Sequence, residues 1–180
     1  MPNASPLADD ATLVRAAVRG DEQAFEALYQ RHRHYVLSVA VRFGADPDGA
    51  LDVLQETFLY FLRKLPGFEL RSQFRTFLYP AAKNLALKRG EKGRRHPSLE
   101  DHPEALALLS APNGIGVQRR KVAEYVAALP EAQREVVMLR FVDGFRLGEI
   151  AEALGVPQGT VKSRLHHALA ALRGEEDDFF

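Results

Sequence analysis

The sequence predicts an all-α protein: two small helical domains joined by a flexible linker, the C-terminal one a helix-turn-helix. Apolar residues recur at three- and four-residue spacing through most of the 180-residue chain, and no alternating strand pattern appears. The stretch 96–117 instead contains proline, glycine and asparagine turn signals that separate two helical segments. The predicted fold class rests on these two observations.

Four helices are expected before the linker, each with a start or stop signal and an apolar face. Their expected bounds are Asp9 or Asp10 to Gly20, Phe25 to Gly44, Asp48 to Pro66-Gly67, and Ser72 onward. The residues expected to face inward are Leu13, Val14, Ala17, Val18, Phe25, Leu28, Tyr29, His32, Val36, Val39, Ala40, Phe43, Leu51, Leu54, Phe58, Phe61, Leu62, Leu65, Phe74, Phe77, Leu78, Ala81 and Leu85. Matching apolar faces predict one compact core. Pro80 lies inside the fourth helix and removes a backbone hydrogen bond, so a kink is expected there.

A second helical unit follows the linker. Its first helix is expected to begin around Val122, and Pro130 starts another helix that runs to Gly144. Ala151, Gly155 and Val161 then have the spacing of a helix-turn-helix: a small residue at the helix contact, a glycine at the turn and a β-branched residue in the second helix. The second helix of such a motif is the one that enters the DNA major groove.

The polar face of that second helix suits DNA. It carries side chains that can donate to phosphates and base edges. These side chains are Gln158, Lys162, Ser163, His166 and His167. No carboxylate occurs between Val156 and Arg173 to repel a phosphate backbone. The coincidence of turn, apolar stripe and acid-free face favours DNA over an ordinary solvated surface.

Charge is segregated along the chain although its formal sum is zero. Residues 71–95 contain eight lysines and arginines and one acid, whereas residues 98–118 contain three acids and no lysine or arginine. The chain has no cysteine, which excludes disulfides and thiolate metal sites and suits a reducing cytoplasm. No apolar run reaches the roughly 18 residues of a membrane span, and the N-terminus is unlike a signal peptide, so we expect a cytoplasmic protein without membrane insertion.

Three sequence motifs follow one another along the chain. They are Asp52–Phe58, Phe74–Tyr79 with Asn84–Ala86, and Leu129–Arg140 leading into Gly159–Leu165. With these motifs the chain resembles bacterial RNA polymerase sigma factors of the extracytoplasmic-function (ECF) group over residues 9 to 173. The resemblance implies a protein without catalytic residues, cofactor, metal or small-molecule substrate. Its implied partners are core RNA polymerase, promoter DNA and an anti-sigma protein.

The same resemblance implies four segments. Residues 1–95 form a domain similar to sigma region 2, which binds core polymerase and the minus-10 element. Residues 96–117 are the linker, residues 118–174 a domain similar to sigma region 4 for the minus-35 element, and residues 175–180 an acidic tail, expected to be disordered.

The resemblance also assigns roles to particular residues. Asp52, Gln55, Glu56 and Leu59 share one side of the third helix and are the expected contacts with core polymerase. Strand opening needs cations for the backbone and aromatic walls for flipped bases. The expected minus-10 contacts are Phe68, Arg71, Arg75, Tyr79, Lys83, Asn84, Lys88 and Arg89. Phe74 and Phe77 are assigned first to the core. The expected minus-35 contacts are the polar-face residues Gln158, Lys162, Ser163, His166 and His167 together with Arg164, and with Thr160 near the helix start for a phosphate.

Two other classes remain open from the residues alone. A free-standing transcriptional regulator would bind its operator unaided, and the acidic face of the third helix would then be idle. A metal enzyme would need ligands from the six histidines. They are His32, His34, His96, His102, His166 and His167. Their spacing forms no ligand set, and no Ser/His/Asp arrangement or phosphate-binding glycine loop occurs.

Overall fold

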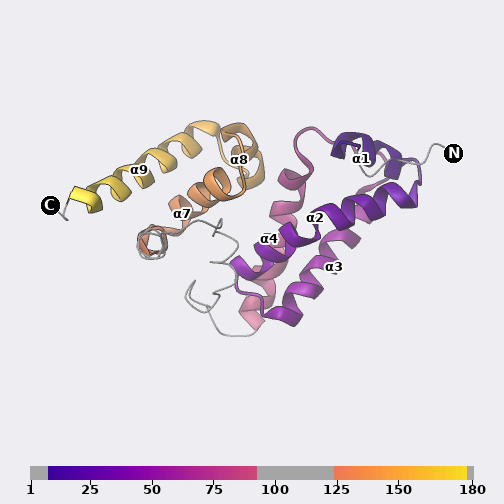
Figure 1. Cartoon of the computed structure of the whole chain (residues 1–180), viewed down its shortest axis with the longest axis horizontal. Helices are drawn as coiled ribbons and strands as arrows, with labels where there is room; N and C mark the ends of the chain where they lie inside the picture. The colour runs from indigo at the N-terminus through magenta and orange to yellow at the C-terminus, as the bar shows by residue number, and fades with distance from the viewer. Residues whose placement is uncertain (1–7, 93–123, 178–180) are drawn as a thin grey trace, which may run out of the picture. The chain divides into compact units, whose positions relative to one another are not determined.

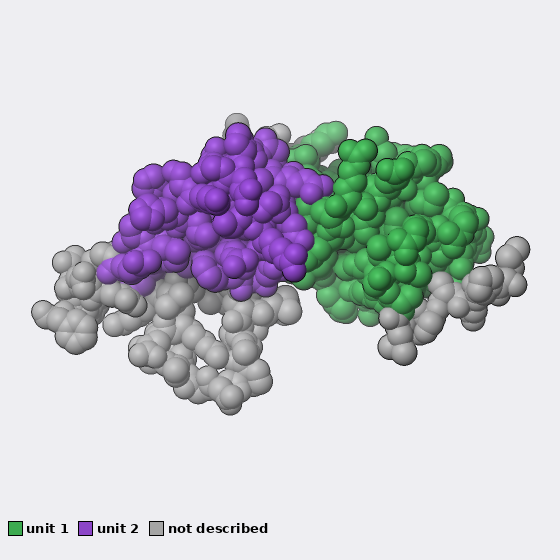
Figure 2. Space-filling view, turned by 90° about the horizontal axis from the view of Figure 1, so that it is seen from above, with its two compact units in different colours: residues 1–98 green, residues 99–180 purple. Residues whose placement is uncertain are grey.

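The computed structural model describes residues 8–92 and 124–177, and within these ranges every regular element is a helix, which confirms the predicted class (Figure 1). The chain divides into two compact units, residues 1–98 and residues 99–180, called unit 1 and unit 2 below (Figure 2). The expected linker 96–117 and the helix start near Val122 lie outside the described ranges. None of the described helices combines the length and apolarity that a membrane crossing requires.

Aspartates set the starts of the first three helices of unit 1. These helices and the fourth are α1 (Asp10–Val18), α2 (Glu22–Arg42), α3 (Pro47–Lys64) and α4 (Phe74–Lys92). The carboxylate of Asp9 accepts from the Thr12 N–H at 2.7 Å, as predicted. Asp21 and Asp46 cap α2 and α3 in the same way. Each cap satisfies a backbone donor that the helix itself leaves unpaired.

The core of unit 1 is an aromatic cluster centred on Phe61. Helix α2 packs against α1, α3 and α4, and α3 packs against α4. The fully buried Phe61 ring lies 4.7 Å from the Phe74 ring and is stacked on the Phe25 ring at 5.8 Å. Burying each such ring contributes about 1.5–3 kcal/mol, so this cluster fixes the angles at which α2, α3 and α4 meet.

The prediction that Leu51 and Leu62 of α3 lie in the core is wrong. Leu51 is 52% exposed and Leu62 is 48% exposed. The buried stripe of α3 consists of Ala50, Val53, Leu54, Thr57, Phe58 and Phe61. Each of the two leucines follows a member of this stripe by one residue, which rotates it about 100° away from the core.

Helix α4 continues through Pro80. A proline in a helix interior removes one hydrogen bond and costs about 3 kcal/mol. Burial on both sides of the proline offsets that loss, because Leu78, Tyr79, Ala82 and Ala86 are all fully buried. The helix therefore does not end where local preference alone would interrupt it.

A polar contact ties α1 to α2. Asp10 lies 2.9 Å from the Nε2 atom of the buried His32 and accepts from Arg31 at 2.7 Å. Burial opposes ionisation of Asp10, but the hydrogen bonds from His32 and Arg31 outweigh it and lower the pKa of Asp10 below its ordinary value. The ionised carboxylate is thus the form that stabilises the contact.

Unit 2 is a second, smaller helical core. Residues 124–128 are helical. They are followed by α7 (Glu131–Val137), the π-helix η2 (Met138–Val142), α8 (Leu147–Leu154) and α9 (Gln158–Asp177). Leu129, Val137 and Ala168 form the centre of its core, joined by the partly buried Val126, Leu165 and Leu172. Both α7 and α8 pack against α9.

Two expectations in unit 2 need correction. The single helix expected from Pro130 to Gly144 changes at Met138 from α- to π-geometry, and Arg140 closes the following turn by donating to the Phe145 carbonyl at 3.0 Å. The acidic tail was expected to be disordered from residue 175, but α9 extends to Asp177. Residues 178–180 are outside the described ranges.

Candidate polymerase-binding and DNA-binding surfaces

One exposed face of α3 carries the predicted polymerase contacts. Asp52, Gln55, Glu56 and Leu59 are all exposed, Leu59 by 47%. They lie opposite the stripe that packs on α2 and α4, as their spacing predicts. We call these four residues the α3 face. It combines the two carboxylates of Asp52 and Glu56, the amide of Gln55 and the solvent-exposed aliphatic side chain of Leu59.

A groove of about 410 Å³ borders the α3 face. It is lined by Phe25, Glu26, Tyr29, Gln55, Phe58, Leu59 and Leu62. The sequence pattern predicted that Phe25 and Tyr29 face the core, and it indicated no role for Glu26. Both aromatic side chains are instead only partly buried. Their four-residue spacing on α2 was visible in the sequence, but only the packing of α2 on α3 shows that they and Gln55 share a groove.

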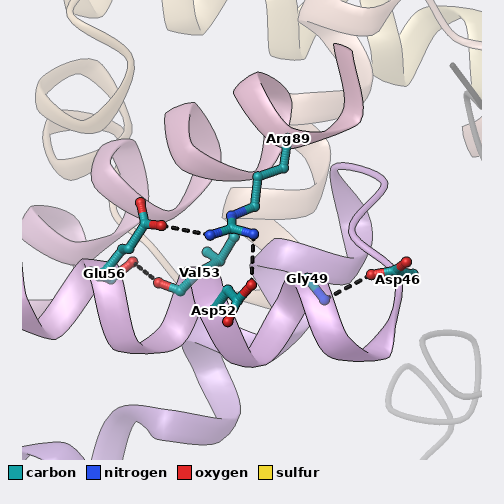
Figure 3. Close-up of polar contacts among 7 residues, drawn as sticks. Asp46, Gly49, Asp52, Val53, Glu56 and Arg89 are labelled. Atoms are coloured by element: carbon teal, nitrogen blue, oxygen red, sulfur yellow. Dashed lines mark hydrogen bonds and ion pairs between the residues drawn. The ribbon is translucent and has the colours of Figure 1, made fainter. Parts of the chain in front are cut away.

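Arg89 of α4 joins the two carboxylates of the α3 face. Its guanidinium donates to Asp52 at 2.7 Å and to Glu56 at 2.6 Å (Figure 3). The hydrogen bond from Arg89 to Glu56 and the charges of both carboxylates raise the pKa of Arg89 above its ordinary range. The sequence analysis predicted Arg89 as a minus-10 DNA contact. In the structure its guanidinium instead lies against Asp52 and Glu56, two of the predicted polymerase contacts.

The other predicted minus-10 contacts fall into two groups. Arg71, Asn84 and Lys88 are exposed. Arg75 and Lys83 are partly buried, and each lies over an aromatic ring: the Arg75 guanidinium is 4.1 Å from the centroid of Tyr35, and the Lys83 ammonium is 5.1 Å from the centroid of Phe43. The charged ends of both side chains therefore pack on aromatic rings, and these two residues are less accessible than Arg71, Asn84 and Lys88.

Tyr79 is not available to DNA, which corrects its assignment as a minus-10 contact. Its side chain is completely buried. The ring packs edge-on against Phe43 at a centroid distance of 6.2 Å. Phe68 is different, because its side chain is partly exposed and its ring lies 4.7 Å from that of Phe77. Of the two assigned aromatic residues, only Phe68 reaches the surface.

The helix-turn-helix forms as predicted. Gly155 ends α8 with a φ of 63°, a left-handed conformation that glycine adopts without strain. The Val156 N–H donates to the Ala151 carbonyl at 3.0 Å and closes the turn. Ile150 and Val161 are fully buried where α8 meets α9. Val161 therefore anchors the N-terminal half of α9 to α8, while Gln158, Lys162 and Ser163 of the same half remain exposed.

The predicted minus-35 contacts lie along that half of α9. Gln158, Lys162, Ser163, His166 and His167 are exposed, and Thr160 and Arg164 are partly buried. Ser163 Oγ lies 3.5 Å from His167 Nδ1. The helix therefore offers hydroxyl, imidazole and ammonium groups without a competing carboxylate up to Arg173. In the described ranges, no three His, Cys, Asp or Glu side chains lie close enough to hold a metal ion.

Comparison with known proteins identifies both units. Residues 28–96 match Sigma-70 region 2, and residues 119–172 match Sigma-70 region 4. The ECF RNA polymerase sigma-E factor of Escherichia coli K12 is 34% identical over 176 residues, covering 91% of this chain and 92% of the relative. The chain belongs to the ECF sigma factors. The RNA polymerase sigma-H factor of Pseudomonas aeruginosa is similar at 33% identity, covering 91% of each chain.

Solved structures agree with the ECF sigma fold. CnrH, solved in complex with the cytosolic domain of CnrY, superposes with a TM-score of 0.66 at 26% identity and covers 95% of this chain and 99% of its own. The RpoE protein of Bartonella quintana, solved with the anti-sigma factor NepR, shares the fold with a TM-score of 0.61 at 23% identity, covering 83% of this chain and 94% of its own. This sigma factor is a transcription initiation factor that directs core RNA polymerase to promoters.

Proposed function

We propose that this sigma factor binds core RNA polymerase through the α3 face. The supporting observation is that two carboxylates, an amide and an exposed leucine share one side of α3 beside an apolar groove. Such a mixed surface suits a partner helix with basic and aliphatic residues. Arg89 holds Asp52 and Glu56 in place, so a partner contacts carboxylates whose positions are already restricted.

Charge removal tests this surface. The double variant Asp52→Asn/Glu56→Gln is expected to weaken core polymerase binding about 2- to 30-fold, because each exposed charge pair contributes about 0.2–1 kcal/mol. Glu22→Gln is the matched control, since it removes an exposed carboxylate from the first turn of α2. Fluorescence anisotropy of labelled sigma factor with purified core polymerase gives both affinities. Equal affinities for the double variant and the control would remove the α3 face from the proposal.

We assign minus-10 binding and strand opening to the surface of unit 1 that carries Phe68, Arg71, Asn84 and Lys88. The three polar side chains are exposed and Phe68 is partly exposed. Arg75 and Lys83 contribute charge from partly buried positions. Single-stranded DNA is bound by cations along its backbone and by aromatic faces for its bases, and this surface supplies both.

We assign minus-35 binding to α9. This helix is the second helix of the helix-turn-helix, and its N-terminal half carries no acid. In holoenzyme, the double variant Lys162→Ala/His166→Ala is expected to lose minus-35 protection in footprinting while core binding is retained. Unchanged protection would remove α9 from promoter recognition. Glu152→Gln on the exposed surface of α8 is the control.

The remaining roles follow from this assignment. Residues 1–95 form the polymerase and minus-10 domain, residues 96–117 the linker and residues 118–174 the minus-35 domain. The protein acts in the cytoplasm with the polymerase and has no catalytic activity of its own. An anti-sigma protein is a further proposed partner, because the RpoE protein of Bartonella quintana, which has the same fold, was solved in complex with the anti-sigma factor NepR. Co-purification with core polymerase separates this function from that of a free-standing regulator, which would bind DNA alone.

A further inference from the structure

Resting on the minus-35 role proposed for α9, we infer that promoter binding by the holoenzyme is coupled to proton uptake by His166 and His167, so promoter affinity rises as pH falls through the neutral range. The two imidazoles are adjacent in α9, both are exposed, and their ring centroids are 5.8 Å apart. Imidazole is the side chain that ordinarily changes its charge between about pH 5 and pH 8. A ring that touches a DNA phosphate therefore gains a charge attraction when it is protonated.

Lys162 brings the phosphate backbone to His166. It lies one turn earlier on the same side of α9, and both side chains are exposed. A phosphate attracted by the Lys162 ammonium lies beside the imidazole of His166. An anion next to an imidazole favours the protonated form of the ring. Proton uptake by His166 is therefore linked to DNA binding, and each promotes the other.

The neighbour of His167 is compatible with both protonation states of the ring. Ser163 lies one turn earlier, and its Oγ atom is 3.5 Å from His167 Nδ1. The hydroxyl can donate to Nδ1 of a neutral ring and can accept from the Nδ1–H of a charged ring. In both states Nε2 carries the proton that the ring offers to DNA. Protonation of His167 therefore adds a positive charge without breaking its contact with Ser163.

No acid neutralises these imidazoles in the described part of the chain. The residues one turn beyond them, Ala170 and Ala171, are exposed and too short to cover the rings. The elements that pack against α9 carry the charged side chains Glu124, Glu131, Arg134, Glu135, Glu149 and Glu152. Within the described ranges, none of these acids forms an ion pair with either imidazole, and Glu149 instead accepts from the Arg146 N–H. The charge that each ring gains is therefore available to attract DNA.

The test compares binding of the holoenzyme to a duplex promoter at about pH 8 and about pH 6. The promoter is one that the wild-type holoenzyme transcribes. The wild type is expected to bind about 2- to 30-fold more tightly at the lower pH, because each exposed charge pair contributes a factor of about 1.4 to 5. The variant His166→Gln/His167→Gln keeps polar side chains that cannot take up a proton, and it is expected to lose this gain. His34→Gln removes an exposed histidine of α2 and is the matched control, which is expected to behave as the wild type does.

Salt dependence and proton uptake test the mechanism directly. The slope of log affinity against log salt is expected to steepen at the lower pH by up to about 0.9 for each imidazole that holds a phosphate. Titration calorimetry in two buffers of different ionisation enthalpy counts the protons taken up when the holoenzyme binds the promoter. The glutamine variant is expected to show neither the steeper slope nor the extra proton uptake. The variant His166→Lys/His167→Lys carries permanent charges and is expected to bind tightly at both pH values.

Two results would overturn the inference. An equal gain at the lower pH in the wild type and in the glutamine variant would show that the protons bind elsewhere. Weak binding by the lysine variant at both pH values would show that the imidazoles do not serve as cations for phosphate. Failure of the wild-type holoenzyme to bind the promoter at either pH, or an unchanged minus-35 footprint in Lys162→Ala/His166→Ala, would instead refute the proposed function on which the inference rests.

Discussion

Replacing Tyr79 with alanine is expected to destabilise unit 1 rather than to remove a DNA contact. The side chain is fully buried and packs on Phe43, so truncation removes apolar contacts and leaves a cavity. Buried aromatic-to-alanine changes cost about 3–5 kcal/mol, against a total of about 5–15 kcal/mol for a typical domain. Tyr79→Phe preserves the ring and is expected to cost less than about 1.5 kcal/mol.

Hydrogen–deuterium exchange of the full chain measures this change where it occurs. Peptides from α2, α3 and α4 report opening of unit 1 separately from unit 2. Tyr79→Ala should lose most of its protection in these helices and keep that of α9. Wild-type protection in all helices, combined with weaker promoter binding by holoenzyme, would refute the burial argument and restore Tyr79 as a DNA contact.

Three further predictions concern the turn, acid stability and salt. Gly155→Ala is expected to destabilise unit 2 by about 1–2 kcal/mol through its left-handed backbone alone, because an added Cβ meets no atom within 4 Å; unchanged exchange in α8 and α9 would contradict this. The lowered pKa of Asp10 means that its contribution to stability is present above the ordinary value of about 3.9 and is lost as pH falls through the lower folded value. Asp10→Asn should therefore flatten the acid branch of the stability curve, and an unaltered branch would exclude this carboxylate as its source. Lys162→Ala is expected to reduce the salt slope of duplex promoter binding by about 0.9 if the lysine holds one phosphate, whereas a change in sequence preference at constant slope would indicate base contact.

Much of the fold was predictable because its signals are local. Asp9 as a cap, Gly44 as a stop and Gly155 as the turn each act within a few residues, and all three take those roles in the structure. The buried stripe of α3 was only approximately predictable, since Leu51 is as apolar as Leu54 and only the packing partners decide which one is inside. No local sequence pattern predicted the change to π-helical geometry at Met138.

The candidate surfaces were less predictable because they depend on contacts between helices. The spacing of Asp52 and Glu56 placed them on one face, but no spacing rule connects them to Arg89, which lies 33 residues beyond Glu56. Tyr79 was misassigned because an aromatic residue with a basic residue four positions away on either side has the same sequence pattern in a core as in a DNA site.

The most direct test of the central claim is transcription reconstituted from purified core RNA polymerase and this chain. Run-off products from genomic DNA fragments are expected to begin at discrete promoters only when both are present, and the Asp52→Asn/Glu56→Gln variant should require more protein for the same yield. Discrete initiation by core polymerase alone, or none with the chain added and no binding between the two, would contradict the account.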